Sequence, residues 1–400
     1  MGVREARRSR NGRITAAAGR ESAISHSHID SGLLLSALVL VGIGVVMSYS
    51  TTAPLSIDQT IPPLFVHHMT ALAIGLITAT AAAFVPLVMW HRIALPIWIL
   101  GVLMLFATFL FGVEVNGAQR WLAIPGTGIR FQPVEPVKFA TLLAVAAIIA
   151  PQDGRTQLSR GRALAAIGVA LPAILFLLMQ PDLGNAILLA ALVAMLLIVA
   201  GIPLRTLVAP GLVACLGIAT YIAFNPYAMR RVVAFLDPWK DPQGAGFQLV
   251  QSFIAFNQGG LFGVGLGNGR QKLFYLPEAH TDFILSLVAE ELGLVGILVV
   301  LGAFAALLIS GTRIARRANS RFALLMAFET TCLLAVPAIV NAAVVMGMLP
   351  TKGLTLPFLS YGGTSLVICC TILGVLLGIS RQRGPAIIVS NRRRSPGGGV

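Results

Sequence analysis

The sequence predicts an all-α integral membrane protein with ten transmembrane helices and a long extracytoplasmic loop between spans 7 and 8. Three observations lead to this fold class. Of the 400 residues, 56% are hydrophobic and only 11% are charged, whereas a soluble domain carries about 25% charged residues. Apolar runs of about 20 residues, the length that crosses the hydrocarbon core, recur along the chain. Arginines cluster in alternate connections between these runs.

The apolar runs follow one another with short connections, except before the eighth. The first follows an arginine-rich segment, but it is about 19 residues long and lacks a small-residue cleavage site, so we interpret it as a span and not as a cleaved signal. The ten predicted spans lie near residues 32–50, 68–88, 93–113, 134–150, 163–180, 183–201, 206–224, 283–310, 322–346 and 363–380.

The two ends of the chain lack this apolar pattern. Residues 1–30 and 384–400 are basic and polar, which predicts disordered tails. Residues 31–383 form a single membrane domain. Most of the 29 Lys and Arg residues lie in the tails or in alternate loops, so the positive-inside rule places both tails in the cytoplasm and residues 225–282 outside.

A net charge of +14 would suggest nucleic-acid binding in a soluble protein. Here, arginines beside membrane spans are explained by orientation and by anionic lipid headgroups, so we expect membrane lipid and no nucleic acid as a partner. The four cysteines lie in apolar runs without C-x-x-C spacing, and the histidines show no metal-ligand spacing, so no metal site is predicted. The glycines between 259 and 269 fit no nucleotide-binding fingerprint and predict tight turns.

The predicted outer face holds nearly all of the uncommon polar residues. Residues 225–282 are much more polar than the spans on either side, and loops on rigid scaffolds are where binding and chemistry concentrate. Shorter outer loops are expected at 51–67, 114–133 and 347–362, with a turn at 180–184. Any reaction is therefore expected at this face.

Glu135 and Lys138 place two charges on one face of the fourth span, where each costs roughly 2.5–3.5 kcal/mol when deep. We interpret them as functional in preference to an ion pair that only neutralises itself. For Glu290 and Glu291, in the eighth span, a cavity-facing role and a structural role remain open.

Several motifs, in order along residues 30–383, resemble those of the SEDS proteins (shape, elongation, division and sporulation). They are Arg120-Trp121, Gln132-Pro-Val-Glu135-Pro-Val-Lys138, Gln180-Pro-Asp182-Leu-Gly184, Phe235-Leu-Asp237-Pro-Trp239, Gly246-Phe-Gln248-Leu-Val-Gln251-Ser252, Tyr275-Leu-Pro277-Glu278-Ala-His280-Thr-Asp282, Leu349-Pro-Thr-Lys352-Gly353 and Ser360-Tyr-Gly-Gly363-Thr-Ser365. Two motifs depart from the family pattern: Val134 replaces a serine, and Thr364 replaces another. The segments around 246–248 and 277–280 are more similar to the division branch than to the elongation branch.

The resemblance implies a peptidoglycan glycosyltransferase of the bacterial cytoplasmic membrane that polymerises lipid II, acting at the division septum. It implies Asp282 as the catalytic carboxylate, with Glu135 and Lys138 supporting the site. It also implies a class B penicillin-binding protein and other divisome proteins as partners. No cofactor is identified, and a divalent cation remains open. The expected substrate-binding residues are Arg120, Trp121, Gln132, Asp182, Arg230, Arg231, Gln251, Glu278, His280, Lys352, Ser360 and Ser365.

These residue types suit that chemistry. A diphosphate leaving group is already a stabilised anion, so one base can suffice, unlike the pair of carboxylates in glycoside hydrolysis. Asp282 would accept the proton of the acceptor hydroxyl, and cations would hold the diphosphate. Alternatively, Asp282 caps the helix that follows it. The competing function classes are a lipid II flippase, a polymerase of the elongation branch and a scaffold without catalysis.

Overall fold

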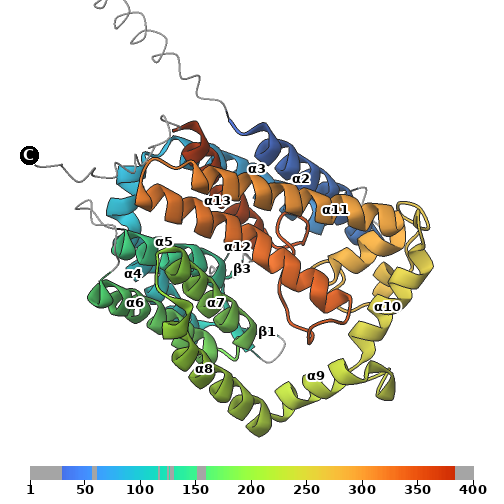
Figure 1. Cartoon of the computed structure of the whole chain (residues 1–400). Coiled ribbons are helices and arrows are strands. Elements are labelled where there is room, and N and C mark those ends of the chain that lie inside the picture. Colours follow the sequence, from blue (N-terminus) through green and yellow to red (C-terminus); the bar gives the residue numbers. More distant parts are fainter. Residues whose placement is uncertain are drawn as a thin grey trace, which may run out of the picture.

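The computed structural model describes residues 29–55, 61–115, 118–123, 126, 130–150 and 159–382, and helices make up most of these residues (Figure 1). The predicted tails lie almost entirely outside the described residues. The long helices are α2 (Ser31–Thr52), α3 (Pro63–Phe84), α4 (Leu87–Phe111), α5 (Val134–Ile149), α6 (Arg160–Met179), α7 (Leu183–Val199), α8 (Leu204–Phe224), α11 (Ile284–Arg316), α12 (Arg321–Val345) and α13 (Gly363–Arg381). The shorter elements are α9 (Pro226–Leu236), α10 (Phe247–Gly259), the 3-10 turns η1 (Ala53–Leu55) and η2 (Pro238–Lys240), and the π-helix η3 (Gln271–Tyr275).

Each of the ten predicted spans coincides in sequence with a helix of the structure. In the described part of the chain, eight helices are long and apolar enough to cross a membrane by length and composition. The other two are shorter: α5 has 16 residues and α7 has 17. The chain is therefore a multi-pass, helical membrane protein.

The boundary between the second and third spans was predicted at the wrong place. The apolar runs suggested spans near 68–88 and 93–113, but α3 ends at Phe84 and α4 begins at Leu87. Pro86 lies between them with an extended backbone. Proline disfavours helical geometry in the residue before it and has no N–H to donate, so it separates two helices inside one apolar stretch.

The centre of the bundle contains α12, which packs against α11, α13, α5 and α7. Close packing of α13 on α3 depends on small residues. A Cβ on Gly374 would lie 2.0 Å from the carbonyl oxygen of Ala79, and one on Gly378 would lie 2.8 Å from that of Ala83. Small residues four apart allow membrane helices to approach closely, so this pair forms one rigid side of the molecule.

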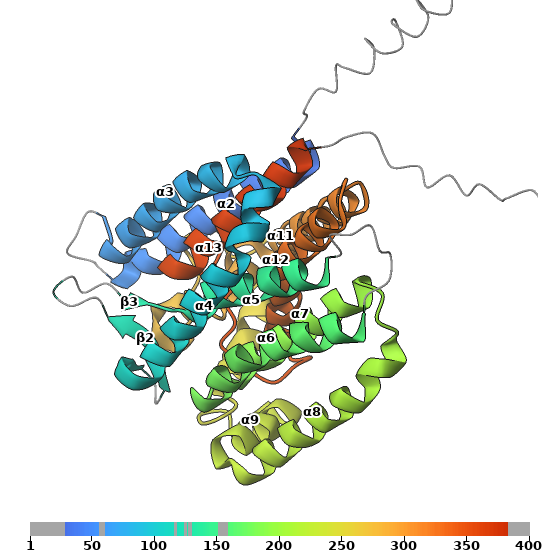
Figure 2. The same ribbon diagram turned by 90° about the vertical axis from the view of Figure 1, so that its left-hand side faces the viewer.

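The segment predicted as a long loop, residues 225–282, is largely helical. It contains α9 and α10, and its glycine-rich part, residues 259–269, lies against α11. α8 and α9 extend along one edge of the molecule (Figure 2), and α8 has no buried residue. Polarity made the segment look like a loop because its helices are short and amphipathic rather than uniformly apolar.

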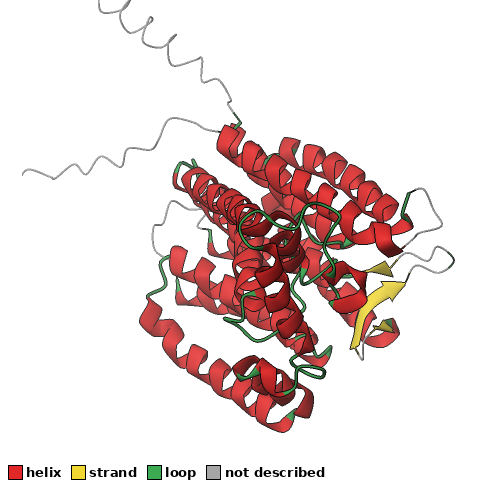
Figure 3. Cartoon of the chain, turned by 90° about the vertical axis from the view of Figure 1, so that its right-hand side faces the viewer, coloured by secondary structure: helices red, strands yellow, loops and turns green. Residues whose placement is uncertain are grey.

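A small antiparallel sheet, which the all-α prediction did not include, follows α4 and precedes α5 in the chain; its strands are yellow in Figure 3. Its strands are β1 (Val113–Val115), β2 (Ala118–Ala123) and β3 (Arg130–Phe131), in the order β1-β2-β3. It carries Arg120 to the end of the bundle where α5 and α7 begin. Strands this short leave too little alternation in the sequence to be recognised.

Candidate active site

The first part of the site is a chain of polar side chains between α5 and α7. Lys138 Nζ lies 2.8 Å from Glu135 Oε1 and donates to Asn185 Oδ1 at 3.0 Å. Asn185 Nδ2 in turn donates to Asp182 Oδ2 at 2.8 Å. Lys138 is 4% exposed, so its charge is compensated by the carboxylate and the amide oxygen rather than by water.

These side chains face a small cavity of about 30 Å³. Gln132, Glu135, Lys138, Asn185 and Ser365 supply its polar lining, and the 353–357 segment closes another side. Residues far apart in sequence thus meet at one place. This space suffices for about one or two water molecules and is too small for a sugar.

Asp282 packs against Gly353, one of the residues that line the same cavity. A Cβ at Gly353 would lie 2.9 Å from Asp282 Oδ2, so the carboxyl group packs directly on this glycine, which lines the cavity. Any larger residue at 353 would displace the carboxyl group. The structure therefore places the Asp282 carboxyl group against a residue of the cavity that Glu135 and Lys138 line, and a joint role of the three side chains stays a prediction.

Burial raises the pKa of Asp282 from 3.8 to about 7. Glu278 raises this pKa further by charge repulsion, whereas Arg231 and Arg120 lower it by attraction, and Asp182 adds a small upward contribution. A carboxyl group with a pKa near neutrality is half ionised at cellular pH. It can therefore both take up and release a proton, as a general base must.

Two arginines approach Asp282 from different elements. Arg120 donates from Nε to the carbonyl oxygen of Gln180 at 3.3 Å and also hydrogen-bonds the carbonyl oxygen of Pro181. Arg231 donates from Nη1 to the carbonyl oxygen of Thr351 at 3.1 Å. Both guanidinium groups act on the Asp282 charge, so this end of the bundle combines a carboxylate with cations that could hold an anion.

A third cation, Lys352, lies over the N-terminus of α7. A Cβ at Gly184 would lie 3.4 Å from Lys352 Cδ, which puts the lysine stem against the first turn of this helix. Burial lowers the pKa of Lys352, and the nearby Asp182 carboxylate raises it. The lysine is therefore a cation that is desolvated and readily available to an incoming anionic group.

The segment that carries Asp282 is fixed by hydrogen bonds to the 341–361 region. Ser360 Oγ donates to the carbonyl oxygen of Thr281 at 2.5 Å, and Asn341 Nδ2 donates to that of Asp282 at 2.7 Å. The Tyr361 N–H donates to the carbonyl oxygen of His280 at 2.8 Å. Ser360 was predicted to bind substrate, but its hydroxyl is buried and used to hold the backbone of the loop.

His280 and Glu278 belong to the same segment. The His280 and Tyr361 rings are 5.6 Å apart, and burial lowers the pKa of His280 whereas Glu278 raises it. Glu278 has φ of 53°, which is unusual for a residue with a side chain. Such backbone strain concentrates at functional sites.

Three predicted residues lie apart from the cavity. Arg230 is exposed, Gln251 is half-buried in α10, and Trp121 pairs with Val113 in the sheet. None of the three is among the described residues that line the cavity.

Asn185 and Asn341 were not predicted from the sequence, and Gly353 was noted only as part of a motif, yet all three contact predicted site residues. Asn185 follows Asp182 by one turn of α7, and Asn341 is a lone amide in an apolar span, so each left a weak signal. In the described residues, no group of three or more His, Cys, Asp or Glu side chains is arranged to hold a metal ion.

Comparisons with known proteins place this arrangement in a family. The FTSW_RODA_SPOVE model, described as cell cycle protein, matches residues 31–384. The chain belongs to this family. A relative from Geobacter sp. (strain M18), named probable peptidoglycan glycosyltransferase FtsW, is 41% identical over 365 residues, which cover 89% of this chain and 98% of the relative. A protein of the same name from Methylomonas methanica is 37% identical and covers 92% of this chain and 96% of its own.

Solved structures of family members have the same fold. A chain from a study of how a peptidoglycan synthase complex coordinates polymerization and crosslinking matches with a TM-score of 0.72 and 29% identity, covering 89% of this chain and 98% of its own. The rod shape determining protein RodA of Thermus thermophilus matches with a TM-score of 0.66 and 28% identity, and the match covers 89% of this chain and 97% of RodA. The FtsW/RodA/SpoVE fold therefore extends over the described bundle.

Proposed function

We propose that this family member is a peptidoglycan glycosyltransferase that polymerises lipid II with inversion at the anomeric carbon and release of polyprenyl diphosphate. The observation that carries the proposal is the position of Asp282: its buried carboxyl group, with a pKa near 7, packs on Gly353, which lines the cavity of Glu135 and Lys138. The names of relatives that cover nearly the whole chain support the same activity.

In this proposal Asp282 is the general base. Its ionised carboxylate accepts the proton of the acceptor sugar hydroxyl, whose oxygen attacks the anomeric carbon of the donor from the face opposite the diphosphate. The bond between this carbon and the diphosphate oxygen breaks, and the electron pair leaves with the diphosphate. General-base assistance of this kind is typically worth about 10²–10⁴ in rate.

The cations around the cavity stabilise the departing diphosphate. Lys138 is held by Glu135 and Asn185. Arg120 and Arg231 interact electrostatically with Asp282, and Lys352 does so with Asp182. Preorganised cations in a site that excludes water interact strongly with developing negative charge. Because they are fixed by the fold, little reorganisation is needed during the reaction.

The membrane arrangement in the proposal has ten spans, with both termini in the cytoplasm and residues 225–282 outside. The ten helices over the predicted runs and the arginine distribution support it. α5 and α7 are short for a span; as partly enclosed helices they need not match the full bilayer thickness alone. The active site then opens at the outer surface, where lipid II is presented.

The proposed site of action is the division septum, as part of the divisome, with a class B penicillin-binding protein as partner. The division name FtsW of the relatives favours this over the elongation branch. The structural match to a chain of a peptidoglycan synthase complex supports a transpeptidase partner.

Purified protein incubated with fluorescent lipid II tests the activity. The expected product is a ladder of glycan polymers, lost in Asp282→Asn while the exposed Asp237→Asn control keeps full activity. Transfer of labelled lipid II across liposome membranes without any polymer would favour a flippase. A fully active Asp282→Asn protein would refute the base assignment.

A further inference from the structure

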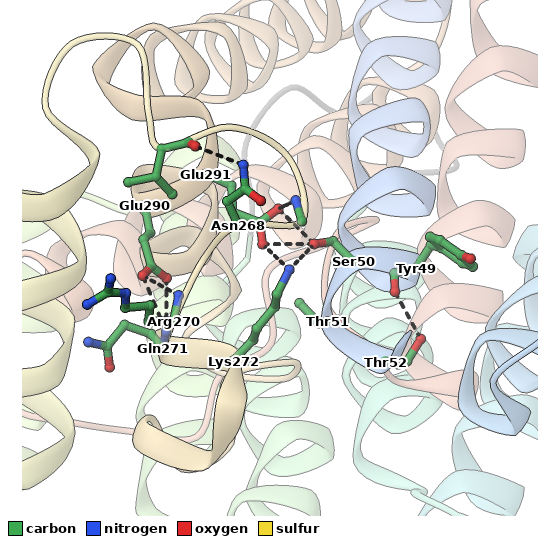
Figure 4. A network of polar contacts seen from close by, with 12 residues as sticks. Tyr49, Ser50, Thr51, Thr52, Asn268, Arg270, Gln271, Lys272, Glu290 and Glu291 are labelled. Carbon is green, nitrogen blue, oxygen red and sulfur yellow. Dashed lines mark hydrogen bonds and ion pairs between the residues drawn. The ribbon is translucent and has the colours of Figure 1, made fainter. Parts of the chain in front are cut away.

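A second buried polar network lies apart from the cavity, where the glycine-rich segment meets α11 and the end of α2 (Figure 4). Glu291 is its centre. It accepts hydrogen bonds from Lys272 Nζ at 2.7 Å and from the Gly267 N–H at 3.0 Å. Ser50 Oγ lies within 2.8 Å of both Glu291 oxygens and of Lys272 Nζ. Three separate parts of the chain are thereby joined at one carboxylate.

The neighbouring Glu290 holds the same segment through backbone groups. Its Oε1 accepts from the Arg270 N–H at 2.7 Å, and both of its oxygens accept from the Gln271 N–H at 3.2–3.3 Å. Two consecutive glutamates of α11 therefore bind residues 267–272 from both sides. Of the two roles left open by the sequence, the structure shows the structural one for this pair.

α11 is shaped to receive the segment. Gly293 has φ of 67° and breaks the helix. A Cβ there would lie 2.4 Å from the Gly263 backbone nitrogen. The carbonyl oxygens of Glu290 and Glu291, freed by the break, accept from the N–H groups of Val264 and Gly265. The segment thus replaces the hydrogen bonds that the helix loses, and its position along α11 is fixed.

A buried ion pair is a poor device for stability alone, because apolar residues of similar volume often stabilise a protein as well or better. The side chains of Lys272 and Glu291 are only 4% and 0% exposed. What such a pair does supply is one defined geometry. In sequence, Lys272 and Glu291 bracket Asp282, so their contact closes a loop that has the carboxylate in its middle.

The middle of that loop, residues 280–282, is held separately by hydrogen bonds from Asn341, Ser360 and Tyr361. From these contacts we infer that Lys272 and Glu291 are positioning residues for catalysis: with Ser50, they hold the first half of the loop so that Asp282 stays packed on Gly353 at the cavity. This inference rests on the proposed function. None of these three residues touches the cavity, so they act only through Asp282.

The test compares full-length variants in liposomes with fluorescent lipid II as substrate. Lys272→Met is expected to lower kcat by about 100-fold, which is the effect of a misplacement of about 1 Å, with little change in KM. Ser50→Ala is expected to act in the same direction but less strongly, and Lys272→Arg to restore part of the loss. The exposed Lys240→Met serves as the matched control and keeps wild-type kinetics.

The pH profile separates positioning from mere folding. In the wild type, the rate should rise with pH up to about pH 7, because burial raises the pKa of Asp282 to about 7. If the loop loosens, water reaches the carboxyl group and the acid limb moves to lower pH. The charges that face Asp282, namely Glu278, Arg231, Arg120 and Asp182, are unchanged in these variants.

Two results would overturn the inference: full activity of Lys272→Met, or a fall in kcat in both Lys272→Met and Ser50→Ala without any movement of the acid limb. If Lys272→Met fails to fold, the inference is decided by whether the acid limb of the pH–rate profile moves in Ser50→Ala. Failure of the proposed function would give other results. The wild-type protein would form no polymer, or Asp282→Asn would still show the acid limb of the pH–rate profile.

Discussion

Replacing Asp282 by asparagine should abolish polymerisation and at the same time stabilise the folded protein at alkaline pH. The folded state raises the pKa of this carboxyl group to about 7 from an ordinary value of 3.8. Each pKa unit corresponds to about 1.4 kcal/mol. The ionised side chain therefore lowers the free energy of unfolding by about 4 kcal/mol above pH 7, and asparagine, which is neutral and similar in shape, removes this cost.

The sign follows from linkage. Because the folded state binds the proton more tightly than the unfolded chain, the stabilising contribution of the protonated Asp282 is complete below about pH 4 and is lost as the pH rises through about 7. The gain from Asp282→Asn should therefore be largest near about pH 8.5 and vanish near about pH 4.

Thermal unfolding of the detergent-solubilised protein, followed by intrinsic fluorescence over this pH range, measures the effect. Asp237→Asn, at an exposed position, should show no such pH-dependent gain. Equal Tm values for Asp282→Asn and the wild type at alkaline pH, or a gain that is the same at every pH, would refute the assignment of a buried carboxyl group with a raised pKa.

Three further changes have clear expected outcomes. Lys138→Met should lower the free energy of unfolding, measured by chemical denaturation, by about 3 kcal/mol because it leaves Glu135 without its cation. Adding Glu135→Leu to this variant should recover most of the lost stability. If it does not, the loss does not come from the Lys138–Glu135 pair. Gly293→Ala should destabilise the protein by about 2 kcal/mol or more, because residue 293 has a positive φ and an added Cβ would meet the Gly263 backbone. Gly302→Ala, in the same helix but with open space around it, should be neutral or stabilising in the same assay. Arg231→Gln removes a charge that lowers the pKa of Asp282, so the acid limb of the rate profile should move to higher pH, and an unmoved limb would exclude this interaction.

Much of the candidate site could be found in the sequence because charged residues are expensive in an apolar chain. Glu135, Lys138 and Asp282 were recognised in this way or through the motifs around them; Glu135 and Lys138 line one cavity, and the Asp282 carboxyl group packs on Gly353, which lines it too. The supporting residues were not recognised. An asparagine such as Asn185 or Asn341 costs less in a membrane helix than a charge does, so it leaves little signal until its partners are known.

The sequence by itself determined that the chain is a multi-pass helical membrane protein with its polar chemistry concentrated at one end, because hydrophobic length and arginine placement are local properties of the chain. Only the tertiary structure decided that residues 225–282 fold into helices and that Lys272 pairs with Glu291. It also decided that the Asp282 carboxyl group packs on Gly353, which lines the α5–α7 cavity. These features depend on contacts between residues far apart in sequence, whose geometry is set by helix packing and by the break at Gly293.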